Sequence, residues 1–287
     1  MSEGSILITG ASTGIGEACA LGFDRLGWEV FAGVRRDEDA KRLGAKSSRG
    51  LRTVILDVTD LGSVELVAKE VADQVGDQGL TALVNNAGIA VGGPVEFVAL
   101  EEWRRQFDVN VIGQVAVTKA VLPLMRRSLS GGRIVFMGSI GGRVSSPFIA
   151  PYTASKHAIE AIAESMRHEL AGSGIRTIVV EPGAVRTPIW DKGQSAANDI
   201  EASLPPEGLQ RYAPAIAQLR KAMEFQSRTG VDPSVVARVV ERAVTAPRPA
   251  ARYVVGRDAK VMAIVARLLP DGARDRANQG LMKLATR

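Results

Sequence analysis

A tyrosine and a lysine four residues apart, Tyr152 and Lys156, form the most chemically distinctive pair in the sequence. They stand at the start of a segment with helical patterning, where this separation brings both side chains onto one face of the helix. An ammonium group beside a phenol favours the phenolate and lowers the pKa of the tyrosine from its ordinary value of about 10. Tyr152 is therefore a candidate general acid or base.

A serine, Ser139, precedes Tyr152 and follows the apolar run from Ile134 to Met137. The run is expected to be a strand, which places Ser139 at the carboxyl edge of a sheet, where doubly wound sheets bind ligands. A hydroxyl group there can hold a substrate oxygen. A lone serine after a strand, or a lone tyrosine at a helix start, would more often be structural, so the assignment depends on a nucleotide site elsewhere in the chain.

A glycine-rich turn near the N-terminus supplies that nucleotide site. A short apolar run leads into the segment from Gly10 to Gly16, and helical patterning follows from Glu17 to Leu26. Glycines allow close backbone approach, and the N–H groups of a helix N-terminus favour a pyrophosphate. The spacing Gly-x3-Gly-x-Gly differs from the common dinucleotide fingerprint, and a tight turn without a ligand is the alternative. The strand before it and the helix after it favour a dinucleotide.

The end of the second expected strand indicates which dinucleotide binds. NAD-binding folds place an acidic side chain there, against the ribose 2'-hydroxyl. This sequence has Val34 followed by Arg35 and Arg36, and arginine can bind a 2'-phosphate through charge-assisted hydrogen bonds. We therefore expect NADP(H) to be preferred over NAD(H). The alternative is an arginine pair that is merely solvated at a strand end.

Short β-type runs alternate with longer helical patterns along the chain. Strands separated in this way must be mostly parallel, because a parallel pair cannot be closed by a tight hairpin. The expected fold is a single-domain α/β Rossmann fold: a doubly wound, seven-stranded parallel sheet with helices on both faces. The expected strands are residues 5–9, 29–34, 53–56, 80–85, 133–138, 175–181 and 252–255.

Two regions depart from this alternation. We expect residues 1–256 to form the dinucleotide-binding and catalytic domain, with residues 187–230, too long for an ordinary connection, acting as a substrate lid. Residues 257–287 are expected to form a helical C-terminal extension. It begins with a basic amphipathic pattern, for which packing against the body is favoured over binding to a membrane surface. The apolar residues of that pattern are Val261, Met262, Ile264, Val265 and Leu268.

Composition limits the remaining possibilities. The 287 residues are 46% hydrophobic and 23% charged, as in ordinary globular proteins. One cysteine, Cys19, and two histidines, His157 and His168, argue against a disulfide framework and against a metal site. The net charge is +5, but the arginines are dispersed and lack interleaved aromatic residues, so no nucleic-acid partner is expected. No long apolar run or signal-peptide pattern occurs, and we expect a cytoplasmic protein without a membrane span.

Together these motifs resemble the short-chain dehydrogenase/reductase family. They occur in the family's order and spacing over residues 5 to about 256. The segment from Val30 to Arg35, the long lid and the C-terminal extension resemble most the subgroup of 17β-hydroxysteroid and retinol dehydrogenases. The segments that carry the resemblance are Thr9 to Gly16, Asn85 to Gly88, Asn110, Ser139, Tyr152 with Lys156, and Pro182-Gly183.

The resemblance implies a role for each site residue. Tyr152 would exchange a proton with the substrate oxygen, and Ser139 would hydrogen-bond that oxygen. Lys156 would bind the nicotinamide ribose and tune Tyr152, while Asn110, inside the helical pattern from Trp103 to Met125, would hold a water that links Lys156 to solvent. The expected cofactor contacts are Gly10, Ser12, Thr13, Gly14, Ile15, Gly16, Arg35, Arg36, Asp57, Val58, Asn86, Ala87, Gly88, Tyr152, Lys156, Pro182, Gly183, Val185 and Thr187.

We therefore expect an NADP(H)-dependent oxidoreductase that interconverts a ketone or aldehyde and an alcohol. A homodimer or homotetramer is implied by the resemblance. The loops and lid are mostly apolar, which favours a bulky apolar substrate such as a steroid, retinoid or terpenoid. The expected substrate contacts are Val91, Phe97, Phe148, Ile149, Ile189 and Trp190, with Val95, Val144 and Tyr212 nearby.

Three alternatives are weighed against this expectation. A 3-oxoacyl reductase is disfavoured by the long chain after Gly256. A non-catalytic NADP-sensing protein would not need Ser139, Tyr152 and Lys156 together. A sugar-nucleotide epimerase or lyase would share the Tyr-x3-Lys pair, but its relatives usually carry a different glycine spacing and a larger C-terminal domain.

Overall fold

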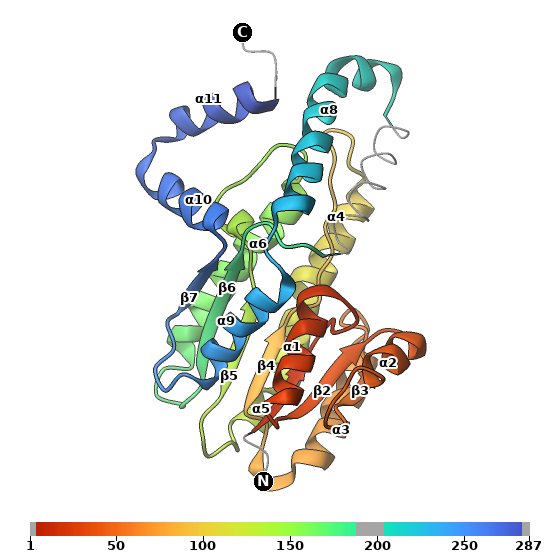
Figure 1. The fold of residues 1–287 in the computed structure, drawn as a ribbon, viewed down its shortest axis with the longest axis vertical. Helices are drawn as coiled ribbons and strands as arrows, with labels where there is room; N and C mark the ends of the chain where they lie inside the picture. The colour runs from red at the N-terminus through yellow and green to blue at the C-terminus, as the bar shows by residue number, and fades with distance from the viewer. Residues whose placement is uncertain (1–3, 188–203, 283–287) are drawn as a thin grey trace.

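A twisted parallel sheet forms the centre of the molecule (Figure 1). The computed structural model describes residues 4–187 and 204–282, and within these ranges the sheet has seven strands in the order β3-β2-β1-β4-β5-β6-β7. Every neighbouring pair is parallel. The doubly wound Rossmann fold expected from the sequence is confirmed. The strands are β1 (Ser5–Ile8), β2 (Glu29–Val34), β3 (Arg52–Ile55), β4 (Ala82–Asn85), β5 (Arg133–Met137), β6 (Arg176–Pro182) and β7 (Arg252–Val255).

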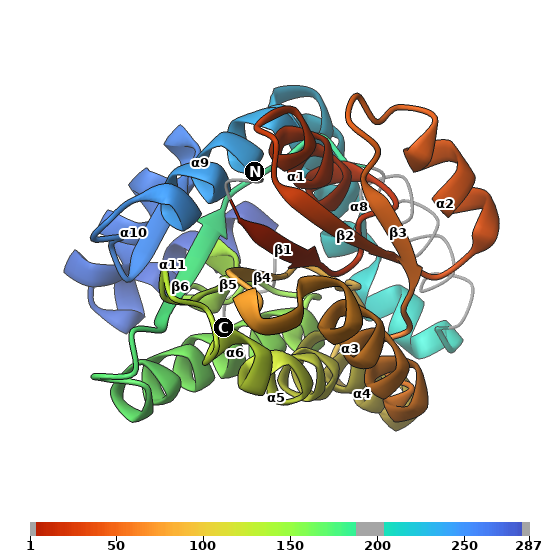
Figure 2. The ribbon, with the colours of Figure 1, turned by 90° about the horizontal axis from the view of Figure 1, so that it is seen from below.

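Helices cover both faces of the sheet, as the view from below shows (Figure 2). The strands are apolar on both sides for this reason: in β1, Ile6 and Ile8 pack on one face and Leu7 on the other. One face is covered by α1 (Gly14–Arg25) and α9 (Pro233–Thr245), with α2 (Asp37–Gly44) beside β2 and β3. The other is covered by α3 (Leu61–Val75), α5 (Gly113–Met125) and α6 (Ala150–Glu169).

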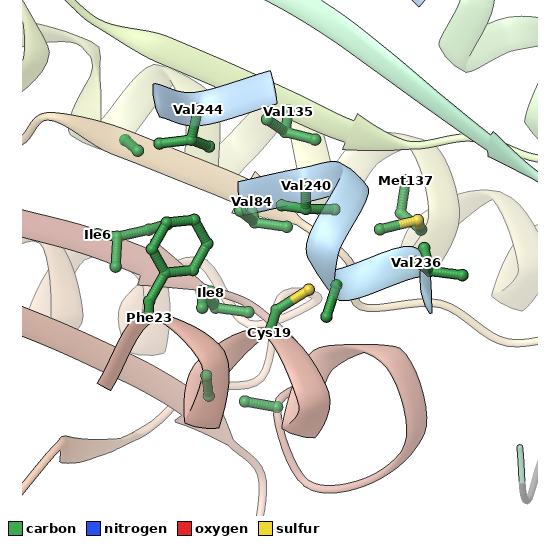
Figure 3. Close-up of a cluster of buried hydrophobic side chains, with 14 of the residues drawn as sticks. Ile6, Ile8, Cys19, Phe23, Val84, Val135, Met137, Val236, Val240 and Val244 are labelled. Atoms are coloured by element: carbon green, nitrogen blue, oxygen red, sulfur yellow. The ribbon is translucent and has the colours of Figure 1, made fainter. Parts of the chain in front are cut away.

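Contacts between α1 and α9 close the first face. Cys19 and Phe23 of α1 meet Val236 and Val240 of α9 above the sheet (Figure 3). Cys19 is fully buried, and burial raises the pKa of its thiol, with the nearby Glu241 adding to the effect. The residue is a small hydrophobic core side chain, because a reactive cysteine needs access to solvent and a stabilised thiolate.

The helix before β5 contains a change of winding. It begins as α4 (Leu100–Phe107), passes through a π-helical turn at Asp108–Ile112 and continues as α5. Leu100–Met125 is long and apolar enough to cross a membrane, with a mean hydropathy of 1.2. In the fold this helix packs against α3 and α6, and 44% of its apolar 18-residue window is buried.

Three further helices extend beyond the carboxyl edge of the sheet (Figure 1). Helix α8 (Pro206–Thr229) lies in the expected lid and continues through Pro214. Helices α10 (Arg257–Leu268) and α11 (Asp271–Met282) form the C-terminal extension, and α11 contacts α8.

The expected packing of α10 against the body is wrong for most of its large apolar side chains. Val261, Ile264 and Leu268 are 60%, 58% and 70% exposed, and Val265 is also exposed. Met262 is partly buried. The reason lies on the opposite side of the helix, where alanines face the body and leave no room for larger side chains.

Gly113 tests the close packing between α5 and the loop after β3. A Cβ atom at this position would lie 2.7 Å from Val58 Cγ2 and 2.8 Å from the Val58 carbonyl oxygen. We expect Gly113→Ala to destabilise the protein by about 1–3 kcal/mol, because the backbone oxygen cannot move aside cheaply. Gly44→Ala, in α2 with open space around it, is the matched control and should be neutral or slightly stabilising. Urea unfolding of both variants measures this, and equal stabilities would contradict the packing argument.

Candidate active site

A cavity of about 430 Å³ opens where the carboxyl ends of the strands meet. Parallel strands bring the residues that follow them to one edge, so segments far apart in sequence share this cavity. Eighteen of the residues expected from the sequence line it: Gly10, Ser12, Thr13, Gly14, Ile15, Arg35, Asp57, Val58, Asn86, Ala87, Gly88, Ser139, Tyr152, Lys156, Pro182, Gly183, Val185 and Thr187.

Gly16, Arg36 and Asn110 lie outside this lining. The structure also adds lining residues that the sequence analysis missed. Several occupy the last position of a strand or the one after it, so a search of all strand ends would have found them. The additional residues are Val34, Leu56, Ile89, Ala90, Arg105, Val109, Met137 and Gly138.

The glycine-rich turn packs tightly against the segment after β4. Gly10 has a φ of +66°, and a Cβ there would lie 2.8 Å from the Ala87 Cα. A Cβ at Gly16 would overlap the Gly10 carbonyl oxygen. Gly16 therefore allows the turn to close tightly, although it does not line the cavity. Asn86 Nδ2 donates to the carbonyl oxygens of Thr9 and Gly10, at 3.0 Å each. The first turn of α1, with Gly14 and Ile15, thus lines the cavity, which fits a pyrophosphate.

A stripe of buried polar side chains on the α4–α5 helix supports the loop that borders the cavity. Gln106, Asn110, Gln114 and Thr118 recur at every fourth position along the α4–α5 helix, and each is fully or almost fully buried. Their spacing places them on one side of the helix. Polar residues at this period within an apolar helix were a signal that the sequence analysis used only for Asn110.

The polar stripe holds the backbone of residues 85–91. Gln106 accepts from the Val91 N–H at 2.7 Å and donates to the Ile89 carbonyl at 2.9 Å. Gln114 donates to the Ala87 carbonyl at 3.1 Å, and Thr118 accepts from Asn85 Nδ2 at 2.8 Å. A loop beside a cavity leaves backbone groups without partners, and these side chains satisfy them.

Asn110 joins this loop to the catalytic helix. Its Oδ1 accepts from the Ile89 N–H at 2.9 Å, and its Nδ2 donates to the Ile89 carbonyl at 3.0 Å and to Ser155 Oγ at 3.1 Å. These bonds make Asn110 a positioning residue. The π-helical turn directs its amide toward Ile89 and α6. The water-holding role implied by the family resemblance stays a prediction.

Ser139, Tyr152 and Lys156 meet in the cavity. The Ser139 hydroxyl is hydrogen-bonded to Tyr152 and accepts from the Gly141 N–H at 3.0 Å. The Lys156 ammonium lies 5.7 Å from the centre of the Tyr152 ring and donates to the Met137 carbonyl at 2.7 Å. A hydroxyl, a phenol and an ammonium therefore converge on one side of the nucleotide cavity.

The pKa of Tyr152 differs from the sequence expectation. Burial raises the pKa of Tyr152, and its hydrogen bond with Ser139 only partly offsets this. We expected Lys156 to lower it, but the ammonium faces the ring and the Met137 carbonyl. Burial lowers the pKa of Lys156 to about 8, opposed by the charge of Glu160. In the protein alone Tyr152 is thus held in its protonated form, the form that can donate a proton.

A charged cluster lies behind Lys156. Glu160, one helical turn further along α6, accepts from Arg252 Nε on β7 at 2.9 Å. Glu181 on β6 is fully buried and binds Arg143 through two bonds of 2.8 and 2.7 Å. Burial raises the pKa of Glu160 to about 7; Arg252 opposes the shift, and the neighbouring Glu181 adds to it. A protonated Glu160 can donate its proton to the neighbouring Glu181 carboxylate, which is the arrangement that a raised pKa favours.

The two arginines after β2 have different surroundings. Arg35 lines the cavity, whereas Arg36 pairs with Asp39 at 3.2 Å. Arg42 also pairs with Asp39, at 2.8 Å, and donates to the Ser12 carbonyl in the glycine-rich turn at 2.7 Å. Burial would raise the pKa of Asp39, but hydrogen bonds from Arg42 and Arg36 bring it below its ordinary value. Asp39 therefore forms an ion pair with Arg36. The sequence analysis missed Arg42, which contacts both Asp39 and the glycine-rich turn.

The aromatic side chains expected to contact substrate form a cluster outside the lining of the cavity. The Tyr212 ring, on α8, packs edge-on against Phe97 and Phe148, with ring centres 6.3 and 5.7 Å apart. The Tyr212 hydroxyl donates to Glu96 at 2.6 Å, which ties α8 to the loop after β4. Phe148 has a φ of +66°, an uncommon conformation for a side chain of this size.

The other residues expected to contact substrate differ in how deeply they are buried. Val91 is buried, Ile149 is partly buried at the start of α6, and Val95 is 61% exposed. Ile189 and Trp190 lie outside the described residues. Within residues 4–187 and 204–282, no group of three or more potential metal ligands comes together.

Comparison with known proteins places this arrangement in context. Residues 5–198 match the family model for short chain dehydrogenases. The chain is 36% identical to the NADPH-dependent 3-dehydrocapnine reductase of Ornithobacterium rhinotracheale, covering 94% of both chains. It is 36% identical to human retinol dehydrogenase 5, covering 94% of this chain and 86% of the relative. A solved short-chain dehydrogenase from Streptomyces avermitilis matches with a TM-score of 0.76 at 27% identity, covering 99% of this chain and 96% of that one.

The fold and the cavity define a Rossmann-type oxidoreductase that binds a nicotinamide dinucleotide. Within that class, the chain belongs to the short-chain dehydrogenase/reductase family and is similar to its retinol dehydrogenases. It acts on a CH–OH or C=O group, as the enzymes of this family do.

Glu160→Gln tests the protonation of the charged cluster. The pKa of Glu160 in the folded protein, about 7, lies above its ordinary value of 4.5. Folding therefore loses stability as pH rises from about 4.5 to about 7, because the unfolded chain releases the proton first. Glutamine imitates the protonated acid and removes this loss. We expect the gain in Tm over the wild type to be larger at about pH 8.5 than at about pH 5, by about 2–4 °C for each kcal/mol.

The matched control for that experiment is Glu164→Gln. Glu164 lies on the same helix and accepts from the same Arg252, at 3.0 Å, but hydrogen bonding and the charge of Arg252 lower its pKa. This variant should gain no stability as pH rises. A gain for Glu160→Gln that is equal at both pH values would show that Glu160 is ionised in the folded protein.

Proposed function

We propose that this chain is an NADP(H)-dependent oxidoreductase that interconverts a bulky apolar ketone or aldehyde and the corresponding alcohol. The observation that carries the proposal is the meeting of Ser139, Tyr152 and Lys156 at the cavity formed by the glycine-rich turn. A non-catalytic NADP-sensing protein would not require a protonated phenol hydrogen-bonded to a serine at this place.

The proton step follows from the geometry of the three residues. When bound, the nicotinamide cofactor supplies or accepts the hydride. Tyr152 donates its proton to the substrate oxygen during reduction, and the raised pKa keeps that proton in place until the oxygen gains charge. Ser139 holds the same oxygen. Lys156 contributes a positive charge beside the ring and a donor for the cofactor ribose.

The preference for NADP(H) rests on Arg35. Its side chain lines the cavity at the end of β2, and the last residue of that strand, Val34, is apolar where an acidic side chain would repel a 2'-phosphate. Arg36 takes a smaller part than expected, because Asp39 binds it. The similar reductase from Ornithobacterium is described by its name as NADPH-dependent, which supports the proposal.

The substrate class rests on the aromatic cluster of Phe97, Phe148 and Tyr212. The edge-on aromatic rings give an apolar surface, which favours a substrate of the same kind. Similarity to retinol dehydrogenase 5 over most of both chains supports a steroid, retinoid or terpenoid over a 3-oxoacyl group. We further propose a homodimer or homotetramer, built on the helices that carry Asn110 and Tyr152, and a cytoplasmic location.

Tyr152→Phe tests the proton step. The variant keeps the ring and removes the donor, so turnover should fall by about 10²- to 10⁴-fold, while NADPH affinity changes little. Rates of reduction of a panel of apolar ketones, followed by nicotinamide absorbance, and a fluorescence titration with NADPH measure the two quantities. Near-normal turnover would remove Tyr152 from the mechanism. NADPH binding by the wild type without turnover of any carbonyl compound would favour the sensing alternative.

Arg35→Ala tests the cofactor preference. A hydrogen bond to a charged group contributes about 1.5–3 kcal/mol, so the loss of Arg35 should weaken NADPH by about 10- to 150-fold and leave NADH nearly unchanged. Exposure and salt place the effect toward the lower end. Arg36→Ala is the matched control and should have a much smaller effect, because Asp39 already binds that side chain. Equal affinities of the wild type for NADPH and NADH would contradict the proposal.

A further inference from the structure

Helix α10 is built with its small side chains toward the protein and its large ones toward solvent. Ala259 is fully buried, and Ala263 and Ala266 are partly buried on the same side. Val261, Ile264 and Leu268 follow one another on the opposite side and are each more than half exposed. Three large aliphatic side chains aligned at helical spacing form an apolar strip with no partner among the described residues.

Cations flank this apolar strip. Lys260 and Arg267 lie along one border, and Arg257 stands at the start of the helix; all three are exposed. The acidic residue of α10, Asp258, is exposed and accepts a hydrogen bond from the Ala184 N–H at 2.8 Å. An apolar strip bordered by lysine and arginine is the arrangement with which a helix binds an anionic lipid surface.

The position of α10 relates this strip to the active site. The helix starts immediately after β7, at the carboxyl edge of the sheet where the cavity opens (Figure 1). The Ala184 N–H that Asp258 accepts from belongs to the residue after Gly183, and Gly183 lines the cavity. A surface bound by α10 would therefore lie at the same end of the molecule as the active site.

We propose that α10 docks the enzyme on an anionic lipid surface, with Val261, Ile264 and Leu268 entering the interface. A second copy of this chain fits the strip less well. An antiparallel pair of α10 helices would bring the cations of one copy against those of the other, and each helix has three cations but only one carboxylate, that of Asp258, to neutralise them. Lipid phosphates supply the complementary charge, and acyl chains supply the apolar contact.

Vesicle sedimentation of the full-length protein tests this inference. We expect binding to vesicles of phosphatidylcholine with about one third phosphatidylglycerol at roughly 0.1 M salt, and at least tenfold weaker binding to pure phosphatidylcholine. Ile264→Ser combined with Leu268→Ser should weaken binding to the anionic vesicles by at least tenfold. Lys260→Gln combined with Arg267→Gln should weaken it to the level of pure phosphatidylcholine.

The matched control removes two exposed leucines elsewhere. Leu61 and Leu66 of α3 are 63% and 71% exposed, and their replacement by serine should leave vesicle binding unchanged. No binding of the wild type to anionic vesicles, or an equal loss in this control, would overturn the proposal. Light scattering decides the remaining alternative: a dimer that Ile264→Ser with Leu268→Ser dissociates would place a second copy on α10. Reduction of a water-soluble ketone by the α10 variants should remain at the wild-type rate.

Discussion

A buried ammonium group, that of Lys156, organises the charged residues around the active site. A cation taken out of water must find compensating charge or hydrogen bonds, and Lys156 has the Met137 carbonyl and the nearby Glu160. Glu160 in turn binds Arg252 of β7, and Glu181 of β6 binds Arg143 just beyond Ser139. These ion pairs connect the segment after β5, helix α6 and strand β6, which carry Ser139, Lys156 and Pro182. They therefore hold the three parts of the site in place.

The loop after β4 is held in a different way, by neutral hydrogen bonds. Gln106, Asn110 and Gln114 satisfy its backbone from one side of a helix. Gln106 and Asn110 use both ends of their amides in this network, whereas Gln114 Oε1 is buried without a partner among the described residues. One side of the cavity, the loop after β4, is therefore held by neutral groups. The other side, behind Tyr152 and Lys156, is held by ionisable groups, so a change of pH acts mainly there.

The sequence predicted the sheet from local patterns, and most of the cavity lining was implied by the resemblance to the short-chain dehydrogenase/reductase family. Apolar runs such as Ile6 to Ile8 specify strands, and parallel strands bring the residues after them to one edge. It failed where a side chain chooses among partners. Nothing local in the sequence showed that Lys156 would face the Met137 carbonyl, or that α10 would turn its alanines to the body and leave Ile264 and Leu268 outside. The ion pair of Arg36 with Asp39, three residues apart, was a local signal that the sequence analysis did not use.

Gly183 and Asp258 make the C-terminal extension inseparable from the nucleotide site. A Cβ at Gly183 would overlap the Asp258 carboxylate, and the Gly183 N–H donates to the Val255 carbonyl at 2.9 Å. The two segments are in direct contact, and only a residue without a Cβ fits at position 183 while Asp258 keeps its place. For protein engineering, this means that cutting the chain after β7 would leave the turn beyond β6 without its packing partner. A shortened enzyme or a chimera should keep Asp258 with the domain, and fusion partners belong at the N-terminal end.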